Sequence, residues 1–140
     1  MIRNLLTVIL LILTTPLFSQ NDSVKKHPID IKCEQCLKAD SSSTTAGMIK
    51  CEIMALKEWD TELNKYYKSL MTKLSPEAKE KLKTAQIKWL DYRDNEIKFS
   101  SKMHSDLKGT MFLVISAGRI TEITKQRALD LKEYYDTMTF

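Results

Sequence analysis

Polar side chains at helical spacing in the middle of the chain are the first candidates for chemistry. Asp60 and Asn64 are four residues apart, so they share one helix face, and Arg93 shares a face with Glu96. Asp60 and Glu96 could act as a general acid and base. We favour a structural network that sets helix register, because Glu96 falls on an apolar side and needs a cation such as Arg93 or Arg127. The predicted network is Asp60, Asn64, Gln86, Arg93, Glu96 and Arg127.

The first nineteen residues predict a secretory signal peptide. Arg3 precedes an apolar run, Leu5 to Leu13, and the segment ends in a small residue, Ser19. The run is too short to span a bilayer, which takes about 20 apolar residues. Because no cysteine follows a cut after Ser19, we expect a periplasmic or secreted protein without a stable membrane anchor. Residues 20–27 then form a flexible segment, and residues 28–140 form one helical domain.

Three cysteines leave several arrangements open. Cys33 and Cys36 have the C-x-x-C spacing of redox sites, but no βαβ pattern surrounds them. His27 and the three thiols could bind zinc, although only if the thiols stay reduced. Export favours one disulfide, in which Cys51 pairs with Cys36 or with Cys33.

The elements that would position these groups are helices. The chain has three glycines and three prolines, too few for a fold with many tight turns. Apolar residues recur at steps of three and four over residues 46–74, 76–107 and 110–138, and a shorter pattern covers residues 28–38. We therefore predict an all-α fold, an antiparallel bundle of three long helices with the short helix across one end.

Capping residues and aromatic anchors refine this prediction. Thr44 or Thr45 suits the start of the first long helix, Ser75 the start of the second, and Gly109 a left-handed C-cap at its end. The tryptophans are predicted to be core anchors, one on each of the first two long helices: Trp59 and Trp89. The second long helix is expected to bury one face, made of Ala78, Leu82, Ala85, Trp89, Tyr92, Phe99, Met103 and Leu107.

Charge and missing motifs exclude several functions. The formal net charge is +4, or +3 without the leader, and basic residues alternate with acidic ones, which does not indicate a nucleic-acid partner. No nucleophile elbow, phosphate-binding glycine loop or H-E-x-x-H motif is present. His27 and His104 stand alone and are expected at the surface. We predict a protein that is not an enzyme and uses no cofactor or metal.

Several motifs together resemble the LprI-type lysozyme inhibitor family. They are Cys36 before a Ser/Thr-rich loop, Met48-x-x-Cys51, Trp59-Asp60-x-Glu62-Leu63-Asn64, Ala85-Gln86-x-x-Trp89 and Tyr92-Arg93-Asp94-x-Glu96. The resemblance extends from His27 to Tyr135 and implies a small exported helical domain with a Cys36–Cys51 disulfide. The chain departs from the family at Ile97, where a further cysteine often stands, and at Cys33, where an aliphatic residue is usual.

The resemblance implies a protein partner, with lysozyme as the candidate. The expected contact segments are the loop at residues 40–45 and the turn at residues 108–110. Animal lysozymes are strongly basic, so a local acidic patch at residues 91–96 is a further candidate contact. The alternative function is an envelope structural or interaction module that has no effect on lysozyme.

Overall fold

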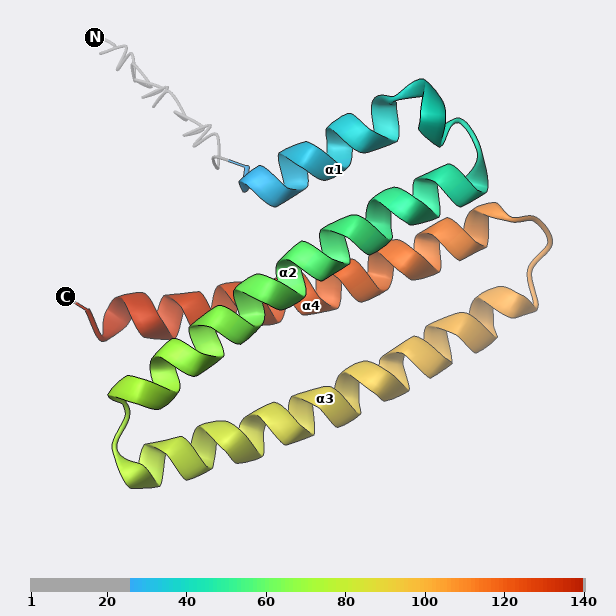
Figure 1. The fold of residues 1–140 in the computed structure, drawn as a ribbon. Coiled ribbons are helices and arrows are strands. Elements are labelled where there is room, and N and C mark those ends of the chain that lie inside the picture. Colours follow the sequence, from blue (N-terminus) through green and yellow to red (C-terminus); the bar gives the residue numbers. More distant parts are fainter. Residues whose placement is uncertain (1–25, 140) are drawn as a thin grey trace, which may run out of the picture.

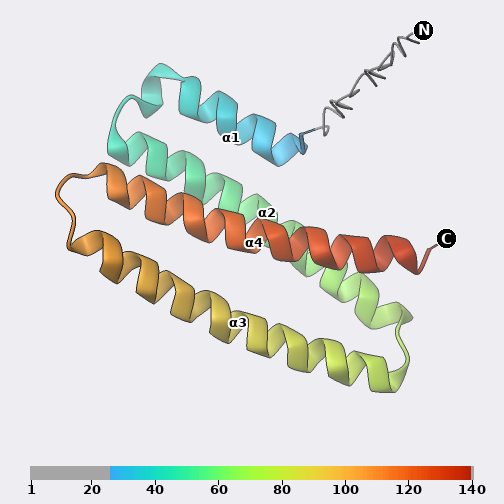
Figure 2. The ribbon, with the colours of Figure 1, turned by 180° about the vertical axis from the view of Figure 1, so that it is seen from behind.

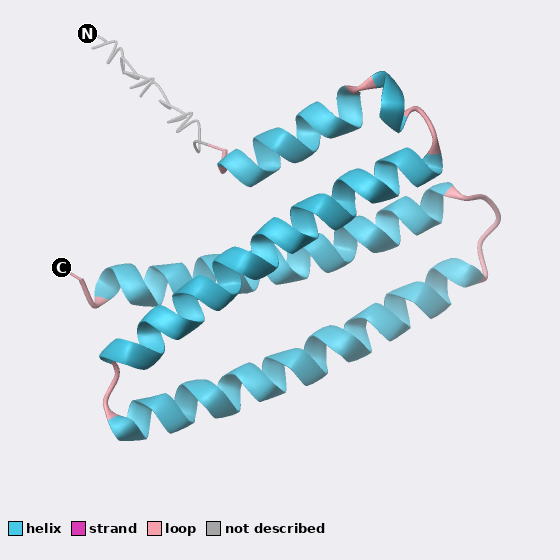
Figure 3. Ribbon diagram, in the orientation of Figure 1, coloured by secondary structure: helices cyan, strands magenta, loops and turns pink. Residues whose placement is uncertain are grey.

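The structure, a computed structural model, describes residues 26–139 and contains only helices and loops within them (Figures 1 and 3). The elements in chain order are α1 (Pro28–Lys38), the short 3-10 helix η1 (Asp40–Ser42), α2 (Thr45–Lys73), α3 (Pro76–Ser105) and α4 (Met111–Thr137). The predicted all-α fold is confirmed, as is its single disulfide. The predicted signal peptide lies outside the described residues.

The core lies between α2 and α4, which are distant in sequence and run in the same direction (Figure 1). Trp59 is only 1% exposed at the centre of this interface, and Leu131 of α4 is fully buried. Trp89 of α3 packs against this core from a partly buried position. The buried core cluster comprises Ile29, Ala55, Trp59, Leu63, Leu70, Ala128 and Leu131. Burying large side chains such as these contributes roughly 1.5–3 kcal/mol each.

Helix α1 lies along the first half of α2, and the prediction that it crosses one end of the bundle is wrong (Figures 1 and 2). Ile29 reaches the core from α1. Asp30 forms a 2.8 Å salt bridge with Lys125 of α4, and both side chains are about one quarter exposed. The ring of His27 lies 4.4 Å from that of Trp59, centroid to centroid. These contacts fix the first turn of α1 against the α2–α4 pair.

Helix α3 packs mainly on α4 and leaves most of its apolar face in solvent. Ser100 is the only fully buried residue in α3, and Phe99 is 62% exposed. Tyr92, Met103 and the adjoining Leu107 are also about half exposed. The expected burial of this face is therefore wrong, because a helix that touches one neighbour can cover only a narrow stripe of its surface.

Local signals set most helix ends. Thr44 caps α2 by accepting a 3.1 Å hydrogen bond from the Gly47 amide, and Ser75 caps α3 by accepting one from Ala78. Gly109 has the positive φ predicted for it, 106°, but the residue that caps the end of α3 is Asp106, so the predicted C-cap role of Gly109 is wrong. Helix α3 ends at Ser105, two residues earlier than the pattern predicts.

Gly47 lets η1 approach the first turn of α2. A Cβ atom at Gly47 would lie 2.5 Å from the carbonyl oxygen of Ser41 and 2.7 Å from Cα of Ser42, both backbone atoms. A Cβ at Gly118 of α4 would instead meet the Glu52 carboxylate at 3.6 Å, an ordinary contact. A methyl group is therefore expected to destabilise the fold at Gly47 but not at Gly118.

We expect Gly47→Ala to lower the free energy of unfolding by about 1–3 kcal/mol, because backbone must move to admit the methyl group. Gly118→Ala should raise it by up to about 1 kcal/mol through helix propensity. Urea unfolding followed by circular dichroism measures both. Equal effects of the two substitutions would contradict the close approach at Gly47.

Candidate binding surface

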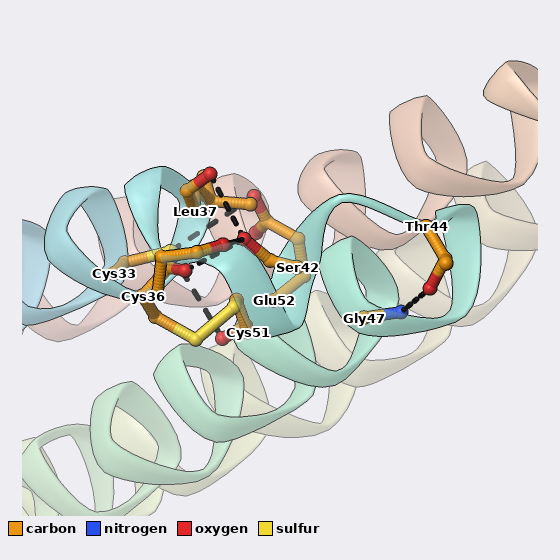
Figure 4. Close-up of a disulfide and its surroundings, with 9 residues drawn as sticks. Cys33, Cys36, Leu37, Ser42, Thr44, Gly47, Cys51 and Glu52 are labelled. Atoms are coloured by element: carbon orange, nitrogen blue, oxygen red, sulfur yellow. Dashed lines mark hydrogen bonds between the residues drawn. A yellow bond between two sulfur atoms is a disulfide. The ribbon is translucent and has the colours of Figure 1, made fainter.

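The loop between α1 and α2 is held by covalent and polar contacts (Figure 4). A disulfide joins Cys36 of α1 to Cys51 of α2, with the two Cα atoms 5.7 Å apart. Buried Ser42 has its hydroxyl oxygen 2.7–3.0 Å from the carbonyl oxygens of Cys36, Leu37 and Ala39. The single O–H proton of Ser42 can be donated to one of these carbonyl groups at a time, and the carbonyls of Cys36 and Ala39 also accept from the backbone amides of Ala39 and Ser42. The exposed side chains of this loop project from a fixed backbone.

The turn between α3 and α4 lies at the same end of the molecule (Figure 1). The hydroxyl of Thr110 forms a 2.8 Å hydrogen bond with that of Thr45 and makes no cap for α4. Large apolar side chains flank the turn and are about half exposed: Leu107, Met111 and Leu113. We call the two segments, residues 40–45 and 107–113, the loop end.

His104 braces the loop end, and the prediction that it is an isolated surface residue is wrong. Its Nδ1 lies 2.8 Å from the Ser116 hydroxyl of α4 and 3.4 Å from that of buried Ser100. The imidazole also stacks on Phe112, with ring centroids 5.7 Å apart. The i, i+4 spacing of Ser100 and His104 was a sequence signal for half of this contact, but nothing in the sequence pointed to Ser116.

The polar residues singled out in the sequence form separate local contacts. Asn64 donates a 3.0 Å hydrogen bond to the Asp60 carboxylate one turn away on α2. Arg93 donates to the carboxylate of its neighbour Asp94 at 2.8 Å, and its guanidinium lies 5.3 Å from the Trp89 ring. These contacts stay within single helices, so they cannot set the register between helices.

Two other contacts do connect helices. Arg127 of α4 donates a 3.0 Å hydrogen bond to the Gln86 side chain of α3. Glu96 of α3 accepts one from Arg119 of α4 at 2.8 Å, in place of the expected Arg93 or Arg127. Arg119 was missed because its partner lies 23 residues away, with the α3–α4 turn between them.

Asp60 and Glu96 do not share a cavity. Asp60 and Arg93 line an open groove of about 430 Å³ between α2, α3 and α4, whose other walls are mainly isoleucine and leucine. Glu96 is not part of its lining and is bound by Arg119 on α4. The structure therefore does not assemble the acid and base pair that the spacing allowed.

The disulfide removes two of the four donors of the possible zinc set, Cys36 and Cys51. No group of three or more metal-binding side chains occurs among residues 26–139. Cys33 keeps a free thiol, whose Sγ lies 4.0 Å from the Cys51 carbonyl oxygen. Burial, together with the nearby carboxylates of Glu52, Asp30 and Glu34, raises the pKa of this thiol.

The fold and the disulfide beside the loop end define a small, disulfide-bonded, all-α domain. The chain belongs to the family described as "Lysozyme inhibitor LprI", whose model matches residues 36–131. Within the described residues, no helix is long and apolar enough to cross a membrane.

A solved structure supports the same fold. It is the crystal structure of an uncharacterized protein from Burkholderia thailandensis, 29% identical in sequence, with a TM-score of 0.75. The match covers 81% of this chain and 56% of the solved chain, so this chain spans little more than half of that protein's length. No curated protein matches the chain.

The polar contacts predict unequal mutational effects. Arg127→Ala should lower the free energy of unfolding by about 1–2 kcal/mol, because a half-buried interhelical hydrogen bond and the packed side-chain stem are both lost. Asp60→Ala should change it by less than about 0.5 kcal/mol, because Asp60 is exposed and bonds only within α2. Thermal unfolding of both variants measures the difference, and a larger loss for Asp60→Ala would contradict it.

The raised pKa of Cys33 predicts a sluggish thiol. At pH 8 the native protein should react with an aromatic disulfide reagent more slowly than the same protein in denaturant, since the thiolate is the nucleophile. Cys33→Ser should leave no reactive thiol and an intact Cys36–Cys51 bond. Native reactivity faster than in denaturant would instead support the redox hypothesis.

Proposed function

We propose that this protein is an exported, non-enzymatic binding protein that inhibits lysozyme by placing its loop end over the lysozyme cleft. The observation that carries this proposal is the 2.8 Å hydrogen bond between Thr45 and Thr110. It joins the loop and the turn, the two segments expected to make contacts, into one surface. Membership in the inhibitor family supports lysozyme as the partner.

The chemistry of the loop end suits a lysozyme cleft. Lysozyme cleaves its substrate with two carboxyl groups that line the cleft. The loop end offers exposed hydrogen-bond donors to such acceptors, the hydroxyls of Ser41, Ser43 and Thr44 and the ammonium group of Lys108. Exposed Leu107 and Leu113 add apolar contact area beside them.

The rigidity of the loop end favours binding as well. The disulfide and the Ser42 contacts hold the backbone before a partner arrives. Ordering a mobile loop on binding costs about 0.5–1.5 kcal/mol per immobilised side chain, and a preformed loop avoids part of that cost.

The acidic stretch at residues 91–96 is a weaker candidate contact. Asp94 is bound by Arg93, and Glu96 is bound by Arg119. Asp91 accepts a hydrogen bond from the Asn95 side chain. Because Asp94 and Glu96 are paired with arginines, only Asp91, whose partner is a neutral amide, offers a basic lysozyme an uncompensated negative charge.

We expect the purified protein to inhibit at least one type of lysozyme in a cell-wall lysis assay. The double variant Ser43→Glu/Lys108→Glu should weaken inhibition at least about tenfold, since carboxylates would then face the carboxyl groups of the cleft. Thr84→Glu/Lys83→Glu makes the same change in charge on α3, far from the loop end, and should retain inhibition.

Two results would count against the proposal. No inhibition of animal, phage or bacterial lysozymes at high molar excess would remove lysozyme as the partner and leave an interaction module. Equal weakening by both double variants would show that the loop end is not the contact surface.

A further inference from the structure

The α2–α3 hairpin concentrates the positive charge of the chain, so the mixing of basic and acidic residues expected from the sequence fails in this segment. Residues 65–88 contain only two acidic residues, Glu77 and Glu80. Their seven lysines are Lys65, Lys68, Lys73, Lys79, Lys81, Lys83 and Lys88. The segment has a net charge of +5 against +4 for the whole chain, so the remainder carries −1. We call the hairpin, residues 65–88, the basic end.

Most of these lysines have no acidic partner. Among the described residues only Lys65 of the seven forms a salt bridge, with Glu62 at 2.9 Å. The ammonium group of Lys73 lies 5.3 Å from the ring centroid of Tyr135. On the neighbouring α4, Asp136 is already bound by Lys132, which leaves Glu133 as the exposed acid nearby. An uncompensated positive field therefore remains at the basic end.

Aromatic rings lie near two of these lysines, Tyr66 at Lys65 and Tyr135 at Lys73, and further apolar side chains are exposed on α3 and α4. The ring of Tyr66 on α2 lies 5.9 Å from that of Tyr135 on α4, so the last turn of α4 lies beside α2 before α2 ends. Tyr134 is 57% exposed there, and Met138 is 43% exposed. Ile87 of α3 is 56% exposed, one turn after Lys83.

We propose that the basic end docks reversibly on a bilayer that contains anionic phospholipids. Lysine presents a compact charge on a flexible stem, so several lysines can each reach a headgroup phosphate without a rigid binding site. The phenol of Tyr134 and the side chains of Ile87 and Met138 suit the boundary between headgroups and acyl chains. These apolar groups favour a bilayer over a phosphate-bearing polymer, which would give them no apolar environment.

Docking in this way orients the protein. The basic end and the loop end lie at opposite ends of the long helices (Figure 1). A molecule held by its lysines would present the loop end away from the bilayer. Membrane binding and lysozyme inhibition therefore use separate surfaces and can fail independently.

The test is co-sedimentation with vesicles. The purified protein should bind vesicles of phosphatidylcholine that contain about 30% phosphatidylglycerol, because each lysine near an anionic surface contributes to the binding free energy. It should not bind vesicles of phosphatidylcholine alone. Raising the salt concentration should weaken the binding. The variant Lys68→Gln/Lys79→Gln/Lys81→Gln/Lys83→Gln should lower the partition coefficient at least about tenfold.

A matched control has the same net charge. Lys38→Gln/Lys50→Gln/Lys98→Gln/Lys108→Gln removes four exposed lysines that form no salt bridge among residues 26–139 and lie outside the basic end. It should keep most of the vesicle binding, and circular dichroism should show that both variants are folded. Ile87→Ser/Tyr134→Ser should weaken binding without changing its dependence on salt.

Three outcomes would overturn the proposal. Equal losses in the two quadruple variants would show that net charge alone drives binding. Binding to soluble polyphosphate but not to anionic vesicles would assign the basic end to a polymer. Absence of any binding to anionic vesicles at low salt would show that the basic end is not a membrane-binding surface, whatever the result with lysozyme.

Discussion

The packing of α2 against α4 around Trp59 is the interaction on which the rest of the structure depends. Both helices bury their apolar faces against each other, and α1 and α3 are added to this pair from different sides. The contact joins segments of the chain that α3 separates, so α3 must bridge the full length of the molecule. Helix α3 is long for that reason, and because it packs mainly on α4, Phe99 and other large side chains stay exposed.

Features of the fold that depend on local sequence were predictable, and features that depend on tertiary packing were not. On α2, five apolar positions of the helical pattern, Cys51, Ala55, Trp59, Leu63 and Leu70, are all buried, because periodicity identifies which face of a helix is apolar. The same pattern failed on α3, since periodicity cannot say whether another helix covers that face. Helix caps such as Ser75 could be predicted from the local sequence, whereas the partner of Glu96 could not, because it depends on tertiary packing. The candidate contact segments were predictable, but the hydrogen bond between Thr45 and Thr110 was not.

The loop end depends on the core through short, stiff connections. Cys51 is buried within α2 and carries the disulfide to Cys36, so the loop at residues 40–45 is tied directly to the helix that contains Trp59. His104 ties the other segment to α4 through Ser116. A surface held in this way loses little conformational entropy on binding, which favours tight binding in an enzyme cleft. The exposed face of α3 has no comparable support and is not needed for that role.

The proposed inhibition of a basic enzyme by a basic protein presents an electrostatic difficulty, and the position of the lysines removes most of it. Helix α2 has 29 residues, which at 1.5 Å per residue separates its two ends by about 43 Å. Charges in water are screened over about 8 Å at physiological ionic strength. The excess of lysines at the basic end is therefore too distant to repel a partner at the loop end. What a lysozyme meets is decided by the local groups, which are the hydroxyls of the loop, the opposite charges of Asp40 and Lys108, and the apolar side chains around the turn. The net charge of the chain therefore does not argue against inhibition.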